Sequence, residues 1–239
     1  MKKSIYLLSI VLLVSFSVNA QKKSKKSEPA EAAPATTATL LTASDSLSYS
    51  FGMLIGTNLL TQQVQGINSQ VLVIGLDHGY AGKNMQLTQE EANKIVQDYF
   101  NSMVQNESAN NLKESEAFLA KNKLEEGVVT LPSGLQYKVL EKGEGPSPKA
   151  TEQVKVHYTG SLINGSIFDS SIERGEPIVF GVNQVIPGWT EALQLMSVGS
   201  RWMLYIPSDL AYGESGAGGV IGPNQALIFE VQLIEIIPE

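Results

Sequence analysis

Residues 154–160 read Val-Lys-Val-His-Tyr-Thr-Gly, so that apolar and polar side chains alternate along the stretch. This period of two predicts a strand with one buried face. Similar alternation occurs over residues 135–139 and 227–237, and one short helix is expected near Trp189–Met196. Several strands and a single amphipathic helix predict an α+β fold, in which a curved antiparallel sheet wraps around that helix.

Aromatic and aliphatic side chains recur in the short motifs within and downstream of this strand. They are Tyr158, Phe168, Val185, Ile186, Trp189, Tyr212 and Phe229. None of these motifs pairs a nucleophile with a base. We therefore expect an apolar pocket, which suits rotation about a peptide bond because twisting an amide needs no acid, base or metal. The alternative is that the aromatic residues only fill the core.

Other kinds of chemistry lack essential parts. The chain has two histidines, His78 and His157, and we expect the second to lie on the polar side of its strand. The glycine-rich run 213–222 lacks the G-K-[ST] ending of a phosphate loop and misses the dinucleotide fingerprint. No G-x-S-x-G elbow occurs, which argues against that type of hydrolase. We interpret the glycine-rich run as a flexible loop before the last strand.

Asp169 is the acidic residue among the aromatic motifs. A general base needs a proton to remove, and no nucleophile lies in a neighbouring motif. We expect a structural role, in which Asp169 accepts hydrogen bonds from Tyr158 or Arg174 and its buried charge is satisfied.

The composition bounds the class of protein. With 239 residues, 43% of them hydrophobic, the chain suits one or two domains with a true core. Its net charge of −7 argues against nucleic-acid binding. It has no cysteine, which excludes disulfides, thiol catalysis and cysteine-bound zinc.

Residues 1–20 have the pattern of a secretory signal peptide. A basic start at Lys2 and Lys3 precedes an apolar segment, and Val18-Asn19-Ala20 is typical of a cleavage site. We expect cleavage after Ala20 and a soluble exported protein, with the periplasm as its location. The alternative is an uncleaved anchor.

Residues 21–43 are rich in Lys, Ala, Pro and Thr and predict a flexible linker. Residues 44–126 predict a helical domain. Its first helix is expected to be capped by Ser44 or Asp45, to run through Leu60 and to end near Gln65-Gly66. Gly52 and Gly56 share a face of it and predict close packing against another helix, with packing inside the same chain as the alternative.

A second helix is expected from Ser69 to about Tyr80, with four apolar residues buried: Val71, Leu72, Ile74 and Leu76. Thr88 and Glu91 form a capping-box pattern at the start of an uninterrupted stretch that reaches Glu126. This long helix is polar nearly all round, which is typical of a helix bridging domains through solvent. Residues 127–239 are expected to form the remaining domain.

Several motifs together resemble the FKBP-type peptidyl-prolyl cis-trans isomerases. They are Val156-His157-Tyr158-Thr159-Gly160, Phe168-Asp169-Ser170-Ser171, Arg174-Gly175-Glu176-Pro177, Val185-Ile186-Pro187-Gly188-Trp189, Met196-Ser197-Val198-Gly199 and Ala211-Tyr212-Gly213. Residues 44–126 look like the N-terminal dimerisation domain of the Mip/FkpA-like branch of that family.

The resemblance implies roles for individual residues. Catalytic roles fall on Tyr158, Asp169, Tyr212 and Phe229. Substrate-binding roles fall on Phe168, Arg174, Ile178, Val185, Ile186, Trp189 and Ile221, with Trp189 as the floor under the proline ring. Ile178 stands where family members often carry an aromatic wall, and Ala217-Gly218 replace a histidine and proline that some members have.

The resemblance implies no cofactor and no metal. The implied partners are unfolded or partly folded polypeptides that contain proline, a second copy of the chain in a homodimer and, by family resemblance, macrolide inhibitors. The function expected is catalysis of X-Pro isomerisation during the folding of exported proteins, with chaperone activity. The competing hypothesis is a binding module that protects clients without catalysis.

Overall fold

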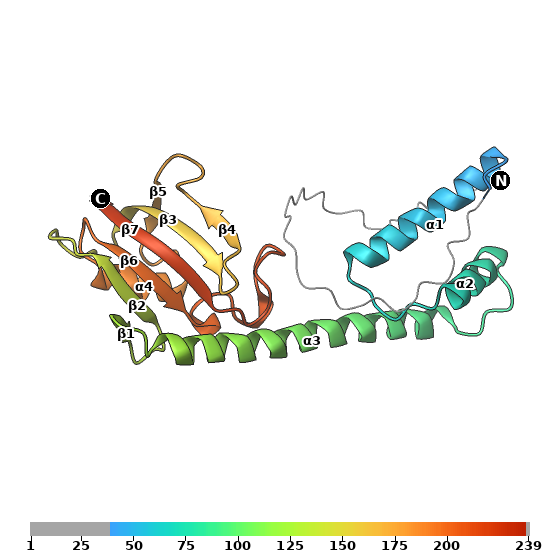
Figure 1. Ribbon diagram of the computed structural model, residues 1–239, viewed down its shortest axis with the longest axis horizontal. Helices are drawn as coiled ribbons and strands as arrows, with labels where there is room; N and C mark the ends of the chain where they lie inside the picture. Colours follow the sequence, from blue (N-terminus) through green and yellow to red (C-terminus); the bar gives the residue numbers. More distant parts are fainter. Residues whose placement is uncertain (1–38, 238–239) are drawn as a thin grey trace. The chain divides into compact units, whose positions relative to one another are not determined.

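Residues 39–237 are described by a computed structural model of the chain (Figure 1). The predicted signal peptide, its cleavage site and most of the predicted linker lie outside these residues. The chain divides into two compact units, one up to Asp77 and one from His78 onward. The long helix belongs to the second unit, whereas the sequence pattern grouped it with the N-terminal helices.

The first unit contains helix α1 (Ala43–Thr61) and most of α2 (Ser69–Ala81). Helix α1 is capped by Thr42, and not by Ser44 or Asp45 as expected. The Thr42 side chain accepts from the backbone N–H of Asp45, and the Asp45 carboxylate accepts from the Thr42 backbone. The cap was misplaced because Asp45 has the reciprocal role of the capping box, three residues into the helix.

The predicted burial of the second helix is wrong for the single chain. Val71, Ile74 and Leu76 of α2 are 61%, 47% and 45% exposed, and no residue of α1 is buried. A side chain added at Gly52 or Gly56 would meet no described atom within 4 Å. The alternative of tight packing inside the chain at these glycines is therefore wrong for the described residues.

Helix α3 (Gln89–Asn122) begins with the predicted capping box of Thr88 and Glu91. It ends four residues before the predicted Glu126, through a turn that leads into the first strand. The expectation that the helix bridges through solvent is wrong for its C-terminal half. There Ser115 and Asn122 are buried against the rest of the second unit, because their polar groups find hydrogen-bonding partners in it.

The second unit has a seven-stranded antiparallel sheet in the order β1-β2-β6-β7-β3-β4, with β5 also paired to β3. The strands are β1 (Val128–Thr130), β2 (Gln136–Glu141), β3 (Gln153–Leu162), β4 (Ile167–Ser170), β5 (Ile178–Gly181), β6 (Arg201–Ile206) and β7 (Leu227–Ile237).

Strand β3 organises the sheet. It pairs with β7 from Gln153 opposite Ile237 to Leu162 opposite Leu227. Its other edge is shared, since β5 pairs with its first half and β4 with its second. Burial alternates along β3 as the sequence predicted, and the register shifts at Lys155/Val156 opposite β7. Such shifts bend a strand, and the sheet is curved and does not close.

Helix α4 (Pro187–Leu195) packs against this sheet (Figure 1). Its buried residues Trp189, Ala192 and Leu193 join one core with Val154 and Val156 of β3 and further strand residues. The predicted α+β fold, with a curved antiparallel sheet around one short helix after an all-α region, is confirmed. No helix within residues 39–237 has the length and apolar character needed to cross a membrane.

Candidate active site

A cavity of about 450 Å³ opens beside α4. Most of its lining is aromatic or aliphatic, and it draws on β3, β4, β5, β7, α4 and the connecting loops. The lining residues are Tyr158, Phe168, Asp169, Phe180, Gln184, Val185, Ile186, Trp189, Tyr212 and Phe229. The chain thus brings eight of the predicted site residues together from positions up to 71 residues apart.

Trp189 anchors the cavity from the first turn of α4 and is 3% exposed. Its ring meets Tyr158 and Phe229 edge to face, each at 5.3 Å between centroids. Gly188 lets the helix start close to β6, because a Cβ there would lie 2.5 Å from Ile206 Cγ2. The Trp189 Nε1–H is buried without a hydrogen-bonding partner among the described residues. The helix start and these two edge-to-face contacts therefore hold the indole in one orientation.

One wall is formed by Phe168 of β4 and Phe229 of β7, whose rings also meet edge to face at 5.5 Å. Both rings lie over Gly160 of β3. A Cβ at that position would approach Phe168 and Phe229 atoms to 2.7 Å, far inside van der Waals contact. Glycine is thus needed at this point of β3 for the two rings to line the cavity.

Phe180 supplies an aromatic wall that the sequence reasoning missed. Its ring contacts Trp189 edge to face at 5.7 Å and Tyr158 at 6.1 Å. Ile178, predicted for this side, pairs with Val156 and packs against the core without lining the cavity. The two residues are two apart on β5 and share a face, so strand alternation marks Phe180 as a candidate beside Ile178 but does not choose between them.

Two more predicted residues lie beside the cavity rather than in its lining. Ile221 is 8% exposed and belongs to the hydrophobic core. Arg174 lies on the loop after β4 and reaches the site through Tyr158 and Asp169. Gln184 lines the cavity, and no motif in the sequence marked it.

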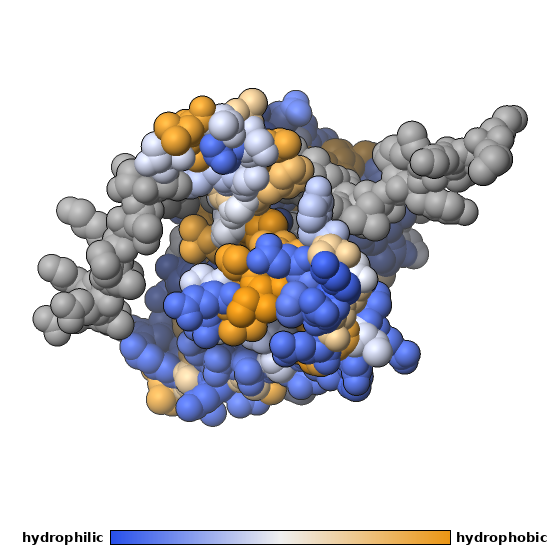
Figure 2. All heavy atoms as spheres, turned by 90° about the vertical axis from the view of Figure 1, so that its right-hand side faces the viewer, coloured by the Kyte–Doolittle hydropathy of each residue, from blue (hydrophilic) through white to orange (hydrophobic). Residues whose placement is uncertain are grey.

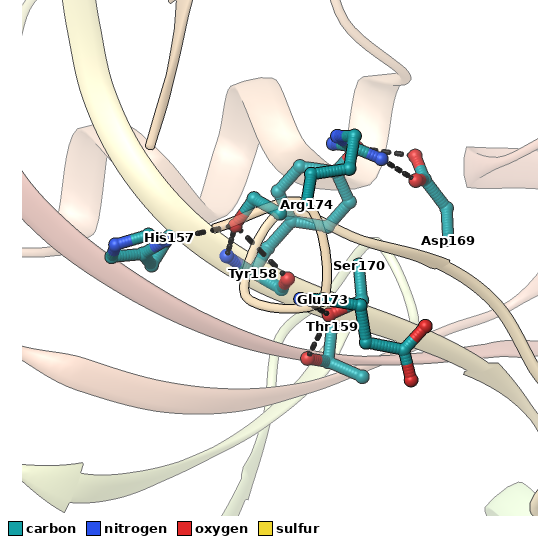
Figure 3. Close-up of polar contacts among 8 residues, drawn as sticks. His157, Tyr158, Thr159, Asp169, Ser170, Glu173 and Arg174 are labelled. Atoms are coloured by element: carbon teal, nitrogen blue, oxygen red, sulfur yellow. Dashed lines mark hydrogen bonds and ion pairs between the residues drawn. The ribbon is translucent and has the colours of Figure 1, made fainter. Parts of the chain in front are cut away.

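The polar side of the cavity is a trio of Tyr158, Asp169 and Arg174 (Figure 3). The Tyr158 hydroxyl and the Arg174 guanidinium both donate to the Asp169 carboxylate, and Arg174 Nη2 lies 3.0 Å from the Tyr158 oxygen. The guanidinium carbon is also 5.6 Å from the centre of the Tyr158 ring. The Asp169 side chain is 40% exposed, so its predicted hydrogen bonds are present but its predicted burial is wrong.

These contacts affect the ionisation of the trio in opposite directions. Burial acts to raise the pKa of the Asp169 carboxyl, but hydrogen bonds from Tyr158 and Arg174 and the Arg174 charge together lower it below the ordinary value. Burial, and then the hydrogen bond to Asp169, raise the pKa of the Tyr158 hydroxyl. At neutral pH the site therefore holds a carboxylate, a neutral phenol and a guanidinium, and no group is poised to exchange a proton.

Ser171 holds the backbone of Tyr158 in place. Its buried hydroxyl accepts from the Tyr158 N–H at 2.8 Å, and its own N–H donates to the Tyr158 carbonyl at 3.0 Å. The half-buried His157 ring contacts the same hydroxyl at 3.0 Å (Figure 3). His157 therefore contacts the outer side of this support, and it is not among the residues that line the cavity.

The arrangement can enclose a small apolar ring and present polar groups at one side. Residues 39–237 contain no cluster of three His, Cys, Asp or Glu side chains able to hold a metal ion. The aromatic enclosure and its ionic trio can act on a substrate by shape, exclusion of water and hydrogen bonding.

Comparison with known families matches the two parts of the chain separately. Residues 145–234 match the family described as FKBP-type peptidyl-prolyl cis-trans isomerase. Residues 44–139 match the family described as the domain amino terminal to FKBP-type peptidyl-prolyl isomerase. Together the two matches extend over most of the chain.

Individual relatives agree with these families. The chain is 45% identical over 204 residues to the outer membrane protein MIP of Legionella longbeachae, covering 82% of this chain and 87% of that protein. It is also 45% identical over 204 residues to the peptidyl-prolyl cis-trans isomerase Mip of Coxiella burnetii, covering 82% of this chain and 88% of that one.

A solved structure gives the same result for the fold. The crystal structure of FkpA from Escherichia coli matches with a TM-score of 0.71 at 35% identity, covering 82% of this chain and 95% of FkpA. The fold, the aromatic cavity and these relatives agree, and the chain belongs to the FKBP-type peptidyl-prolyl cis-trans isomerases.

Proposed function

We propose that this isomerase binds the proline ring of a polypeptide in the cavity, with Trp189 as the floor. Phe168, Phe229 and Phe180 form the surrounding walls, and Val185 and Ile186 lie immediately before α4. The observation that carries this proposal is the convergence of aromatic rings from separate elements on one indole that is 3% exposed. A cavity of this composition accepts a five-membered apolar ring and excludes water from the X-Pro bond that precedes the ring.

The reaction is rotation about the X-Pro bond, whose planar form is favoured by amide resonance with a barrier of ~18–20 kcal/mol. Twisting the bond removes the resonance and makes the carbonyl less polar. An apolar cavity disfavours the planar amide relative to the twisted one, so the transition state is bound more tightly than the ground state. In this proposal the Asp169 trio faces the twisted amide, and the Tyr212 hydroxyl and the Ile186 backbone N–H hold flanking carbonyls. Ile178, Arg174 and Ile221 act indirectly, by supporting the lining.

The decisive test compares the full chain with two aspartate variants in an exchange assay on a proline-containing tetrapeptide. Wild type should catalyse exchange, and Asp169→Asn should reduce kcat/KM by about tenfold, since each 1.36 kcal/mol of lost transition-state stabilisation is tenfold in rate. Asp209→Asn removes a carboxylate that is exposed outside the cavity and should leave kcat/KM unchanged. Equal effects of the two substitutions would overturn the assignment of Asp169 to the site.

The N-terminal helices support a further proposal, association of two copies through residues 44–126. Large apolar side chains of α1 are solvent-exposed in the single chain, among them Leu47 at 60% and Phe51 at 61%. Figure 2 shows apolar side chains gathered in an orange patch bordered by blue polar side chains. Exposed apolar patches of this kind occur where another protein surface packs.

Export to the periplasm and assistance to the folding of exported proteins are also part of the proposal. They rest on the signal-peptide pattern of residues 1–20 and on the similarity to FkpA and Mip proteins. Apolar side chains of α2 that are exposed in the single chain, Val71 at 61% and Ile74 at 47%, suit contact with unfolded clients, which supports chaperone activity. In this proposal residues 127–239 form the isomerase domain, and macrolides that mimic a proline ring would compete for its cavity.

The competing function, client protection without catalysis, predicts a different dependence. Suppression of client aggregation would then survive Asp169→Asn and would be lost when exposed apolar residues of α2 are changed. Loss of protection in the Asp169 variant alone would exclude this alternative.

A further inference from the structure

Residues 211–226 form a loop between β6 and β7 that we call the cavity loop. It begins with Ala211 and Tyr212, of which Tyr212 lines the cavity, and it returns to the core at Ile221. Five of its residues between Gly213 and Gly222 are glycine, and four of these have positive φ. Glycine-rich backbone loses much conformational entropy on ordering, so this loop needs stabilising contacts to hold one conformation.

Asn224 connects the cavity loop to α3. Its backbone N–H donates to the carbonyl of Gly213, the residue after Tyr212, at 2.8 Å. Its side-chain Nδ2 donates to Ser108 Oγ on α3 at 2.8 Å. Its backbone has φ +56, a left-handed conformation that asparagine adopts more readily than most residues. A single residue therefore joins the backbone next to Tyr212 with a side chain of the long helix.

Two further side chains of α3 complete the attachment. Ser115 Oγ donates to the Asn224 carbonyl at 3.0 Å and accepts from the Ala226 N–H at 2.8 Å. Asn111 Nδ2 donates to the Pro223 carbonyl at 2.9 Å. Ser115 is 3% exposed, so breaking its bonds leaves a buried polar group unpaired.

The loop and the helix fit closely at Gly222. A Cβ there would lie 2.7 Å from a Glu107 carboxylate oxygen and 3.0 Å from Asn111 Nδ2. Ser108, Asn111 and Ser115 follow one another at spacings of three and four residues, which places them in one stripe along α3. This stripe gives three polar positions in the middle of α3 a partner in the loop.

We infer that Ser108, Asn111 and Ser115 of α3 are positioning residues for catalysis, which hold the cavity loop, and with it Tyr212, against the cavity. The inference rests on the proposed role of Tyr212 in holding a substrate carbonyl. It assigns to the long helix a part in the isomerase site in addition to connecting the two regions of the chain. In physical terms, the helix lowers the conformational freedom that the five loop glycines would otherwise allow.

The test is a double-mutant cycle in the full chain, built on Ser108→Ala and Asn224→Gly. Alanine is a good helix former, so the first change removes the acceptor without weakening α3. Glycine tolerates positive φ, so the second change removes the side-chain bond and keeps the backbone bond to Gly213. Two quantities are measured: kcat/KM on a proline-containing tetrapeptide, and amide hydrogen exchange in peptides that span residues 211–226.

Each single variant should lower kcat/KM by about threefold to tenfold, the range expected from losing one net hydrogen bond, and should speed exchange in the cavity loop. The kcat/KM of the double variant should be no lower than that of the less active single variant, because both changes remove the same bond. Ser108→Thr keeps a hydroxyl at this half-buried position, so kcat/KM and loop exchange should both stay at the wild-type level. Asn110→Ala, an exposed neighbour on α3, should change neither.

The outcomes separate this inference from the function on which it rests. Inactive wild type would overturn the proposed function, while exchange would still report on the attachment. Faster loop exchange with unchanged kcat/KM would overturn the inference, because the position of the loop would then have no effect on catalysis. Unchanged exchange in both single variants, or additive losses in the double variant, would overturn it as well.

Discussion

Asn122, the last residue of α3, donates a hydrogen bond of 2.8 Å from its side chain to the side-chain oxygen of Gln136 on β2. Both residues are buried, at 8% and 3% exposure, and Gln136 Nε2 in turn donates to the Leu119 carbonyl at 2.9 Å. The end of the helix is thereby joined to the sheet through a buried polar pair.

Asn122→Ala should therefore destabilise the second unit. The change leaves the Gln136 oxygen buried without this partner, and such a group costs about 1–3 kcal/mol. Urea unfolding of the full chain, followed by the fluorescence of its two tryptophans, measures the loss. Asn110→Ala on the exposed side of the helix controls for the higher helix propensity of alanine. Equal midpoints for the two variants would show that the buried pair adds nothing to stability.

Gly160→Ala should reduce activity without altering any charged group. The added Cβ would lie 2.7 Å from Phe168 and Phe229 atoms, so at least one ring must leave its place in the wall. Overpacking of this kind costs about 1–3 kcal/mol, and the cavity narrows. We expect a lower kcat/KM in a chain that is still folded by circular dichroism. Ser161→Ala, at the next position of β3, is the matched control, and wild-type activity of Gly160→Ala would contradict the prediction.

The pH dependence of kcat/KM should be flat between about pH 5 and pH 9, because no residue of the trio titrates there. The pKa of Asp169 is lowered and that of Tyr158 is raised. A carboxyl with a lowered pKa keeps its favourable contacts above its ordinary pKa of roughly 3.9, and it loses them as pH falls through the folded value. Below pH 9, kcat/KM should therefore decline only as pH falls through the pKa of Asp169 in the folded protein.

Tyr158→Phe should shift the pH profile of kcat/KM in a known direction. The variant removes the hydroxyl that donates to Asp169, so the pKa of Asp169 should rise and the acid limb of the profile should move to higher pH. The profile is best measured by exchange spectroscopy on a proline peptide, which avoids a coupled protease with its own pH dependence. A bell-shaped wild-type profile within pH 5–9 would show that proton transfer takes part in the reaction.

Light scattering of residues 21–239 at micromolar concentration should give twice the mass of one copy. Phe51→Glu should shift the protein to the single mass, because a carboxylate at a buried apolar interface is strongly disfavoured. Phe51 is 61% exposed in the single chain, so the change should leave the fold of one copy intact. Ser50→Glu adds the same charge at the neighbouring position as a control. A single mass for wild type would refute the proposed dimer.

The sequence pattern predicted the secondary structure well where the local signal is strong. The period-two burial of β3 and the capping box of Thr88 and Glu91 both occur as expected. The cap of α1 was misplaced because Ser44, Asp45 and Thr42 all have capping side chains, and only backbone geometry selects among them. The burial of Val71 and Ile74 was wrong because an apolar stripe does not specify whether its partner belongs to the same chain.

The sequence by itself determined the α+β fold, the family and most of the residues that surround the cavity, because each lies in a short motif whose spacing is local. Only the tertiary structure decided which side chain of β5 faces Trp189, since Ile178 and Phe180 share a strand face and differ only in how far along the sheet they lie. It also decided that Ser108, Asn111 and Ser115 bind the cavity loop. Those hydrogen bonds join residues about 110 positions apart, and no local pattern along a polar helix indicates the distant backbone that its side chains will meet.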